Sequence, residues 1–361
     1  MTVYLPDQAA RLERFTHSKS PSSLFRTSTL PPPERFAAWR ESMGVFLSSS
    51  LAPEADMEAF RGEVEGYLID DILFGRVLAS GQKYDRGSAK IARDALDHYM
   101  IQVFLDGACE MNVHGRVLQS RPGQAIAFDL GEVLDSVNSD FDLLCLIIPR
   151  ARLAPLLSFP DGLHGGMPVM ESGSGQLLAA FLSSLYISAP SLGPAEARAA
   201  ARALLEMTAA AFNGATVHEA VASSGGQEAL LIHAQSFIRR NLAAADLSPE
   251  MIAHALGISR ASLYRAFEPV GGVAAYAREL RLRKCAADII AVRNAGRQLS
   301  EIAHKWGFTD APHFTRLFKQ RFGQTPGEVR HTMAPFARRD RTELDPRVGD
   351  RRYEEWIAAL A

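Results

Sequence analysis

The chain contains one short pattern twice, and this repeat constrains its fold more than any other feature. The first copy is LSPEMIAHALGISRASLYRAF at residues 247–267, and the second is LSEIAHKWGFTDAPHFTRLFKQRF at residues 299–322. Each copy has a Leu-Ser start, a helix with Ile-Ala-His, a Gly followed by an apolar residue, and a second helix rich in Arg and aromatic residues. We interpret each copy as a helix-turn-helix, which predicts binding to nucleic acid.

Turn and cap residues stand at matching places in the two copies. Gly257 and Gly307 lie where the chain must turn sharply between helices, and a positive φ angle is cheap only for Gly. Ser259 and Asp310 precede the second helices, and both residue types are good helix N-caps. The sequence therefore predicts two similar units, each with a first helix as scaffold and a capped second helix.

The second helix of each copy has an outward face that is suited to DNA. Leu263 and Phe267, like Phe314 and Phe318, are expected to point into the core, so the residues between them face outward. Arginine is the side chain that most often reads guanine in the major groove. The alternatives are a solvated or ion-paired role for the arginines and core packing for Tyr264. The predicted DNA-binding residues are Arg260, Ala261, Tyr264 and Arg265 in copy one, and Ala311, Pro312, His313, Thr315, Arg316 and Lys319 in copy two.

Charge is distributed unevenly along the chain. Residues 1–224 carry 18 Lys and Arg against 26 Asp and Glu, a net charge of −8. Residues 247–330 carry 13 against 7, a net charge of +6, which favours a basic module attached to an acidic one. Four of these cations lie in the helix expected between the copies, where we predict that they lie partly beside DNA: Arg278, Arg281, Arg283 and Lys284.

The region from Phe60 to about Pro149 has the pattern of short strands. Runs rich in β-branched and aromatic residues are separated by Gly, Asp, Asn and Pro. In residues 98–105 every odd position is apolar and the even positions are mixed, as expected of a strand with one face on a core. The spacing of the runs, without intervening helices, predicts an antiparallel barrel or jelly roll.

Helical patterns flank this barrel. Apolar residues from Phe36 to Phe46 recur every three or four positions after three prolines, and residues 175–188 and 194–213 are amphipathic. The helix that opens at Pro194 is expected to close at Asn213-Gly214, and the helix pair serves either domain packing or a dimer interface. The expected parts are a loosely ordered arm (1–30), a sensor or dimerisation domain (31–213), a linker (214–227), a DNA-binding domain (228–331) and a tail (332–361).

The second copy and its flanks resemble a known family. Gly307-Phe308-x-Asp310-x-x-His313-Phe314-x-Arg316-x-Phe318-Lys319-x-x-Phe322-Gly323-x-x-Pro326-x-x-x-Arg330 looks like the signature of the AraC/XylS family of bacterial transcription factors. With copy one and the segment RELRLRKCAADI, the resemblance extends over residues 227–330. RFAAWRE and RPGQAIAFD carry a weaker match to a cupin-like sensor domain of one branch of this family. The fold implied is α+β and multidomain, with an N-terminal cupin-like barrel and a C-terminal all-α domain.

Copy one departs from the family pattern at two places. The segment EPVGGVAA is about two residues shorter than the family's usual turn, and its Pro269 should end the second helix early. Ala261 and Ala311 offer only methyl groups where the family often places larger or polar side chains. We therefore expect copy two to carry more of the sequence specificity.

The barrel is expected to sense a small-molecule effector or to form a homodimer. Arg93, His98 and Gln102 are the candidate effector-binding residues. A metal enzyme of the cupin class is the first alternative, although His98, His114 and His164 lack the close spacing of a metal-ligand pair, so no metal or cofactor is expected. The second alternative is an architectural DNA-binding protein that senses no effector.

The remaining composition points to a cytoplasmic protein, and the doubled motif with the family resemblance implies a regulator and not an enzyme. The odd number of cysteines has no paired spacing, the N-terminus lacks the pattern of a secretory signal, and no run of eighteen apolar residues predicts a membrane span. The family resemblance implies promoter DNA, RNA polymerase, an effector and a second copy of the chain as partners, and activation as the usual outcome.

Overall fold

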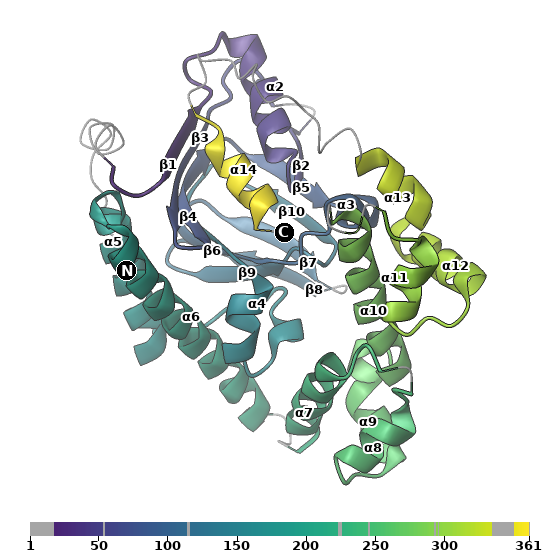
Figure 1. The fold of residues 1–361 in the computed structure, drawn as a ribbon. Helices are drawn as coiled ribbons and strands as arrows, with labels where there is room; N and C mark the ends of the chain where they lie inside the picture. Colours follow the sequence, from purple (N-terminus) through teal and green to yellow (C-terminus); the bar gives the residue numbers. More distant parts are fainter. Residues whose placement is uncertain are drawn as a thin grey trace. The chain divides into compact units, whose positions relative to one another are not determined.

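The computed structural model describes residues 18–360, apart from 53–54, 114–115, 223–225, 245, 292–293, 295 and 334–349. The chain forms two compact units (Figure 1). Unit 1 comprises Met1–Gly87, Leu96–Ala215 and Asp340–Ala361, and unit 2 comprises Ser88–Ala95 and Thr216–Arg339.

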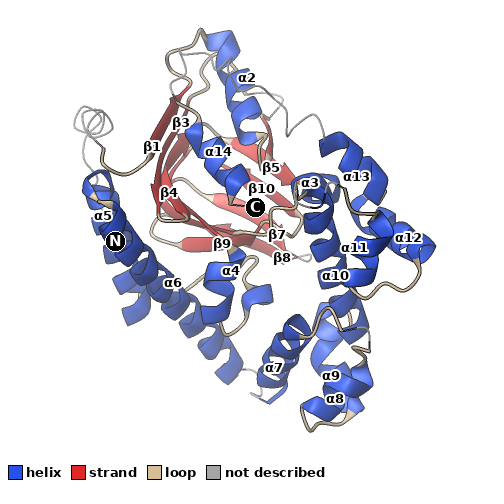
Figure 2. Ribbon diagram, viewed as in Figure 1, coloured by secondary structure: helices blue, strands red, loops and turns tan. Residues whose placement is uncertain are grey.

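Unit 1 is built on two antiparallel sheets, which are red in Figure 2. The six-stranded sheet has the order β1-β3-β4-β11-β6-β9, and the five-stranded sheet has the order β2-β5-β10-β7-β8. This architecture confirms the predicted antiparallel barrel or jelly roll. The strands are β1 (Ser22–Arg26), β2 (Ser48–Ser50), β3 (Gly62–Ile69), β4 (Ile72–Ala79), β5 (Gln82–Arg86), β6 (Tyr99–Asp106), β7 (Cys109–Val113), β8 (Arg116–Ser120), β9 (Ala125–Asp129), β10 (Leu134–Asn138) and β11 (Phe141–Ile148).

Both faces of the six-stranded sheet are buried. Met100 and Phe104 of β6 pack with residues of the other sheet, whereas Ile101 and Val103 pack on the opposite face against the helices of unit 1. The expectation that β6 has one face on a core was therefore wrong. Its mixed even positions include the apolar Met100 and Phe104, which a second layer of structure buries.

Helices cover the sheets of unit 1. Phe36, Trp39 and Met43 form the buried face of α2, as their spacing predicted. The helices are α2 (Pro32–Met43), α4 (Arg150–Leu153), α5 (Gly173–Ser188), α6 (Pro194–Ala222) and α14 (Arg352–Ala359), with 3₁₀ turns η1 (Ala154–Leu156), η2 (Pro160–Gly162) and η3 (Ala189–Ser191).

Three local expectations for the first half of the chain were wrong because long-range contacts decide the local structure. Residues 22–26 were expected in a loose arm but form β1, which pairs with β3. Helix α6 continues to Ala222 instead of closing at Asn213, whose side chain bonds the backbone of Leu156 and Ser158 at 2.9 and 2.8 Å and not the end of its own helix. The connection between β5 and β6 also contains a helix, α3 (Ser88–Asp94), where none was expected.

Unit 2 is helical. Its core joins the long helix α10 to α11, α12 and α13, and Ile91 and Ala92 of α3 are buried in the same cluster. Gly226 begins α7 directly after three residues outside the described range, within the expected linker. The helices are α7 (Gly226–Arg240), α8 (Pro249–Ala255), α9 (Arg260–Phe267), α10 (Val273–Ile290), α11 (Leu299–Lys305), α12 (Ala311–Phe322) and α13 (Pro326–Met333), with the 3₁₀ turn η4 (Glu268–Val270).

Candidate DNA-binding surface and effector cavity

The first helix-turn-helix consists of α8 and α9. The Ser248 side chain accepts a hydrogen bond from the Met251 amide at 3.2 Å and caps α8. Gly257 then turns the chain with a φ of 65°, and Ser259 caps α9 by accepting from the Ser262 amide at 3.1 Å. These caps satisfy amide groups that a helix start leaves without partners inside the helix. The predicted turn and cap of copy one are confirmed.

The second helix-turn-helix consists of α11 and α12. Gly307 turns the chain with a φ of 79°, and the Asp310 carboxylate accepts from the His313 amide at 3.3 Å. The buried face of α12 is a row of three rings, in which the centroid of Phe318 lies 5.6 Å from Phe314 and 4.6 Å from Phe322. This row fixes the rotation of α12 about its axis and therefore sets which side chains face outward.

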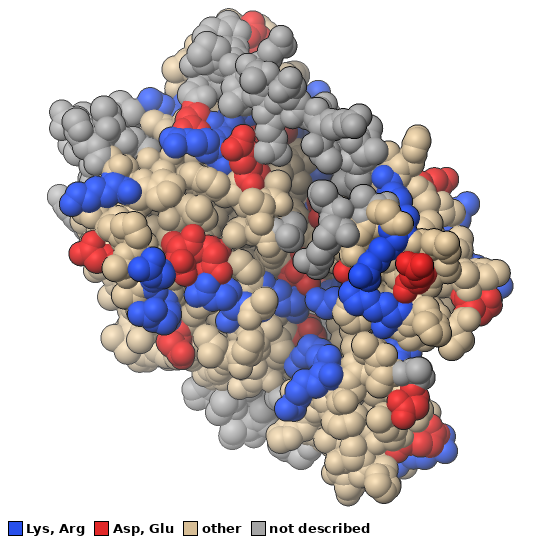
Figure 3. Space-filling view, in the orientation of Figure 1, with Lys and Arg blue, Asp and Glu red and all other residues tan. Residues whose placement is uncertain are grey.

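The predicted DNA-contacting residues lie on the outer faces of α9 and α12. All are exposed except Thr315, which is half-buried. Tyr264 is 45% exposed, so core packing, the alternative for this residue, is wrong in this structure. Figure 3 shows basic side chains over unit 2 with acidic ones among them, so the face in view is not uniformly basic.

The polar residues of these faces differ in how their hydrogen-bonding groups are used. Arg260 pairs with Glu250 at 2.8 Å, and the Thr315 hydroxyl donates to the Ala311 carbonyl at 3.0 Å. Among the residues that the structure describes, no ion pair involves Arg265 or Arg316. Each of these two arginines stands six residues after its helix N-cap, so they occupy equivalent positions. Both guanidinium groups are available to a ligand.

Arg281 of α10 does not lie free beside DNA, contrary to the expectation for the cations of this helix. Its guanidinium donates to the carbonyl groups of Leu242 at 3.0 Å and Ala244 at 2.7 Å, and reaches that of Gly307 at 3.5 Å. A Cβ atom added to Gly307 would lie 2.7 Å from the Arg281 guanidinium carbon. Arg281 therefore links the connection before the first helix-turn-helix to the turn of the second.

Other charged side chains of α10 also pair within unit 2. Glu279 accepts from Arg283 at 3.0 Å and from Arg321 at 2.7 Å, which ties α10 to α12. Burial opposes the charged carboxylate, but the hydrogen bonds and charges of the two arginines outweigh it and hold the pKa of Glu279 below its usual value. Asp288 accepts from Lys305 at 2.6 Å and from the Trp306 ring nitrogen at 2.8 Å. Arg283 is only four residues from Glu279, but the partners in the other contacts are 17 to 42 residues apart, so sequence reasoning missed them.

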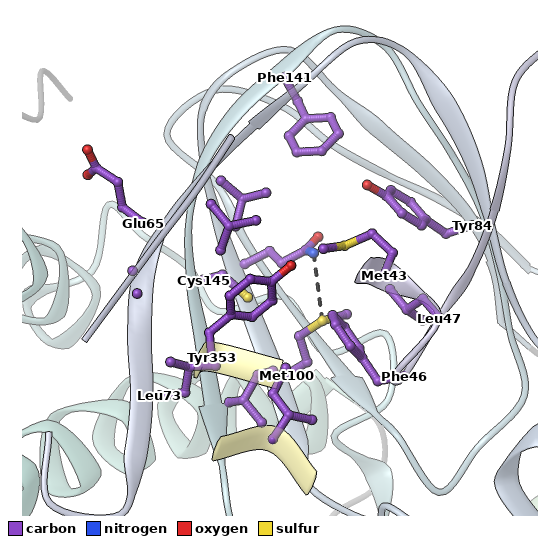
Figure 4. Close-up of a pocket in the computed structure, with 17 residues that line it drawn as sticks. Met43, Phe46, Leu47, Glu65, Leu73, Tyr84, Met100, Phe141, Cys145 and Tyr353 are labelled. Atoms are coloured by element: carbon purple, nitrogen blue, oxygen red, sulfur yellow. Dashed lines mark hydrogen bonds between the residues drawn. The ribbon is translucent and has the colours of Figure 1, made fainter. Parts of the chain in front are cut away.

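Unit 1 contains an apolar cavity of about 50 Å³ between its sheets (Figure 4). Room of this size holds roughly four water molecules. Met43, Phe46 and Leu47 border it from α2 and the residues just after this helix. The other residues of its lining are Val64, Glu65, Gly66, Leu73, Gly75, Val77, Tyr84, Met100, Gln102, Phe141, Cys145, Ile147, Tyr353 and Ile357.

The structure does not bring the three candidate effector residues together. Gln102 lines the cavity, and its amide donates to the sulfur of Met100 at 3.8 Å. His98 is buried, with 3% of its surface exposed, but is not part of the lining. Arg93 lies on α3 and belongs to unit 2, so its proximity in sequence to the barrel strands was misleading. Tyr353 and Ile357 were missed, because the tail gave no signal of docking on the barrel.

No three His, Cys, Asp or Glu side chains gather as a metal site within the described ranges. His114 lies outside these ranges. Of the helices that the structure describes, none has both the length and the hydrophobicity to cross a membrane.

Two family models match the chain, one in each unit. A helix-turn-helix domain matches residues 252–332, and an AraC-binding-like domain matches residues 40–213. The first contains α9 and α12, the recognition helices of the two helix-turn-helix units, and the second contains most of the barrel, α5 and most of α6.

Known proteins are similar over much of this length. The transcriptional activator NphR of Rhodococcus sp is 25% identical over 312 residues, which are 84% of this chain and 91% of the relative. The crystal structure of the AraC-like transcriptional activator CuxR matches with a TM-score of 0.51 and 26% identity, over 73% of this chain and 94% of the other. The right origin-binding protein of Escherichia coli (strain K12) is 38% identical over 88 residues, 24% of this chain and 29% of the relative.

Proposed function

Because the chain belongs to the AraC family of DNA-binding transcription regulators, we propose that unit 2 places α9 and α12 in successive major grooves of promoter DNA. The observation that carries this proposal is the equivalent position of Arg265 and Arg316, both exposed and without an ion pair among the described residues. An unpaired guanidinium can donate to guanine or phosphate without first breaking an internal contact. Exposed Tyr264 and Lys319 extend the same faces.

The apolar cavity of unit 1 is the proposed effector site. An effector that binds one arrangement of the two units better shifts the population that is able to contact DNA. Gln102 is the proposed polar contact, because its amide now donates only to a thioether, a weak acceptor, in the described structure. No catalytic step is part of this function.

Activation of transcription is the proposed outcome, because the relatives NphR and CuxR are named as activators. The function would take place in the cytoplasm, on the nucleoid, with RNA polymerase as the second protein partner. A homodimer is also part of the proposal. Exposed apolar side chains lie on both candidate interfaces: Leu177 and Ile187 of α5 are 60% and 41% exposed, and Val117 and Val137 of the barrel strands are 60% and 53% exposed.

Capture of genomic fragments by the purified full chain would identify an operator and test DNA binding. We expect Arg316→Ala to lower operator affinity by about 1–3 kcal/mol and to relax the preference at one base pair. Arg265→Ala is the matched variant, and its effect should be smaller and more uniform across operator variants. Wild-type affinity should fall steeply with salt, because phosphate contacts release counterions.

Two results would count against this assignment. Unchanged affinity of Arg316→Ala across all operator variants would remove its role in base recognition. Binding that depends weakly on sequence and never responds to an effector would instead indicate an architectural protein.

A further inference from the structure

One wall of the cavity in unit 1 comes from the far end of the chain. Tyr353 and Ile357 of α14 line the cavity, and each is only 1% exposed. Figure 4 shows the Tyr353 ring directed among the other lining side chains, including Met43 and Cys145. Helix α14 lies directly against β3, since a Cβ atom added to Gly66 would be in van der Waals contact with the Cβ atom of Tyr353, at 3.5 Å. The segment after the DNA-binding helices is thus part of the effector cavity.

Polar contacts hold the N-terminal end of α14 in place. The Tyr353 amide donates to the Ser23 hydroxyl at 3.2 Å, and that hydroxyl donates to the Asp350 carbonyl at 2.9 Å. The Tyr353 hydroxyl and the Glu354 carboxylate both bond Ser42 of α2. Arg351 also pairs with Glu41 of α2 at 3.7 Å, and the Arg352 guanidinium donates to the Ser22 carbonyl at 2.6 Å. Water can replace each of these polar contacts when the helix leaves, which offsets most of the stabilisation that they provide.

The strands that form the other walls are held more firmly. β3, β4, β6 and β11 each pair with neighbours on both sides in the six-stranded sheet. Helix α14 has eight residues, buries Tyr353 and Ile357 fully, and packs Trp356 partly against the same core. Sites for small organic ligands usually have volumes of about 300–1,000 Å³, whereas this cavity has about 50 Å³. Entry of such a ligand therefore requires a wall to move, and α14 is attached to the sheet by side-chain packing and hydrogen bonds rather than by a strand ladder.

The lining also restricts the chemistry of the ligand. It contains no Lys, Arg or His among the described residues, so no cation is present to pair with a carboxylate or a phosphate. Its one acidic side chain, Glu65, points away from the other lining residues in Figure 4 and bonds the Tyr186 hydroxyl. A charged ligand would lose its hydration without gaining an ion pair. The Gln102 amide can donate to one ligand oxygen.

We propose that the cavity binds an uncharged, mostly apolar molecule with one hydrogen-bond acceptor, and that this ligand takes the space of Tyr353 and Ile357 and displaces α14. This inference rests on the proposed effector site. Residues 334–349 join the end of α13 at Met333 to Asp350, so a seated α14 restrains the chain that leaves unit 2. Ligand binding removes that restraint. Because the ligand and α14 compete for the same space, the free energy that seats α14 weakens ligand binding by the same amount.

The test uses the full chain with two probes of matched shape. 4′-Methylacetophenone is uncharged and carries a carbonyl acceptor, whereas 4-methylbenzoate is an anion at pH 7. We expect calorimetry to give a Kd at least tenfold lower for the ketone. Amide hydrogen exchange in residues 351–360 should become faster when the ketone is bound.

Variants of α14 distinguish a ligand that displaces this helix from a ligand that only contacts it. Ile357→Ala removes part of the competing side chain, and we expect it to bind the ketone about tenfold more tightly. Ile357→Val should change the Kd in the same direction by a smaller factor, and it keeps the test usable if the alanine variant does not fold. Ala358→Ser, at an exposed position of the same helix, is the control and should leave the Kd unchanged.

Several outcomes overturn the inference. These are slower exchange in α14 with the ketone, weaker ketone binding by both Ile357 variants, equal affinity for the benzoate, or no ketone binding to any form. If the ketone binds and changes operator affinity while α14 stays protected, the proposed function stands and the displacement is wrong. If α14 is released without any change in operator affinity, the site stands and its regulatory role is wrong.

Discussion

The two helix-turn-helix halves of unit 2 share a sequence pattern but differ in length and support. Helix α9 ends at Phe267 after eight residues, and the 3₁₀ turn with Pro269 comes next, as the position of this proline predicted. Helix α12 has twelve residues and ends at Phe322, and the next residue, Gly323, has a φ of 74°. Repeating a motif therefore reproduces its turn and caps, whereas the length of each recognition helix depends on the residues at its C-terminal end.

The cores behind the two recognition helices differ as well. Phe318 of α12 lies between two other rings, and α12 packs in one cluster with α10, α11, α13 and α3. The equivalent Phe267 of α9 pairs with one ring, that of Tyr276, at 5.4 Å. The second helix-turn-helix, which is better packed, should hold the outward face of α12 more rigidly. This agrees with the larger share of sequence specificity expected for copy two.

The largest effect that would test this difference is the loss of a core ring. We expect Phe318→Ala to lower the free energy of unfolding of unit 2 by about 4 kcal/mol and Phe267→Ala by about 3 kcal/mol, because both side chains are fully buried but Phe318 has one more aromatic contact. Amide hydrogen exchange in α12 and α9 would measure each half separately. A larger loss for Phe267→Ala would reverse the ranking of the two halves.

A smaller effect concerns the connection between the halves. Arg281→Met keeps the aliphatic stem but removes the donors to Leu242, Ala244 and Gly307. We expect this change to lower the free energy of unfolding of unit 2 by about 2 kcal/mol. Operator affinity should also fall, because the two recognition helices would no longer be held in one orientation. Arg278→Met, at an exposed position of the same helix, is the stability control. Equal stability of the two variants would show that Arg281 does not join the halves.

The smallest effect concerns the ion pair between Arg260 of α9 and Glu250 of α8. Arg260→Ala should change stability by less than about 0.5 kcal/mol, since both Arg260 and Glu250 are exposed. If Arg260 contacts phosphate, its loss lowers affinity equally for all sequences and reduces the salt slope by about 1. Glu250→Gln should raise operator affinity slightly by releasing the arginine. Lower affinity of this variant would mean that the pair itself positions α9.

Local patterns were sufficient to predict much of unit 2 and less of unit 1. The glycine turns, the caps at Ser259 and Asp310 and the early end of α9 arise from residues within a few positions of one another. Strand β1 and the course of α6 past Asn213 were not predictable in this way. Their local sequences are ambiguous, and partners far along the chain select the structure.

The same difference applies to the candidate sites. The sequence by itself determined the two recognition helices and the outward position of Arg265 and Arg316, because helical periodicity places residues on a face without any tertiary contact. Only the tertiary structure decided that Arg281 joins the two halves, that Arg93 is absent from the cavity and that Tyr353 helps to form it. Each of these depends on groups that meet only after the chain has folded, and no short-range spacing encodes such a meeting.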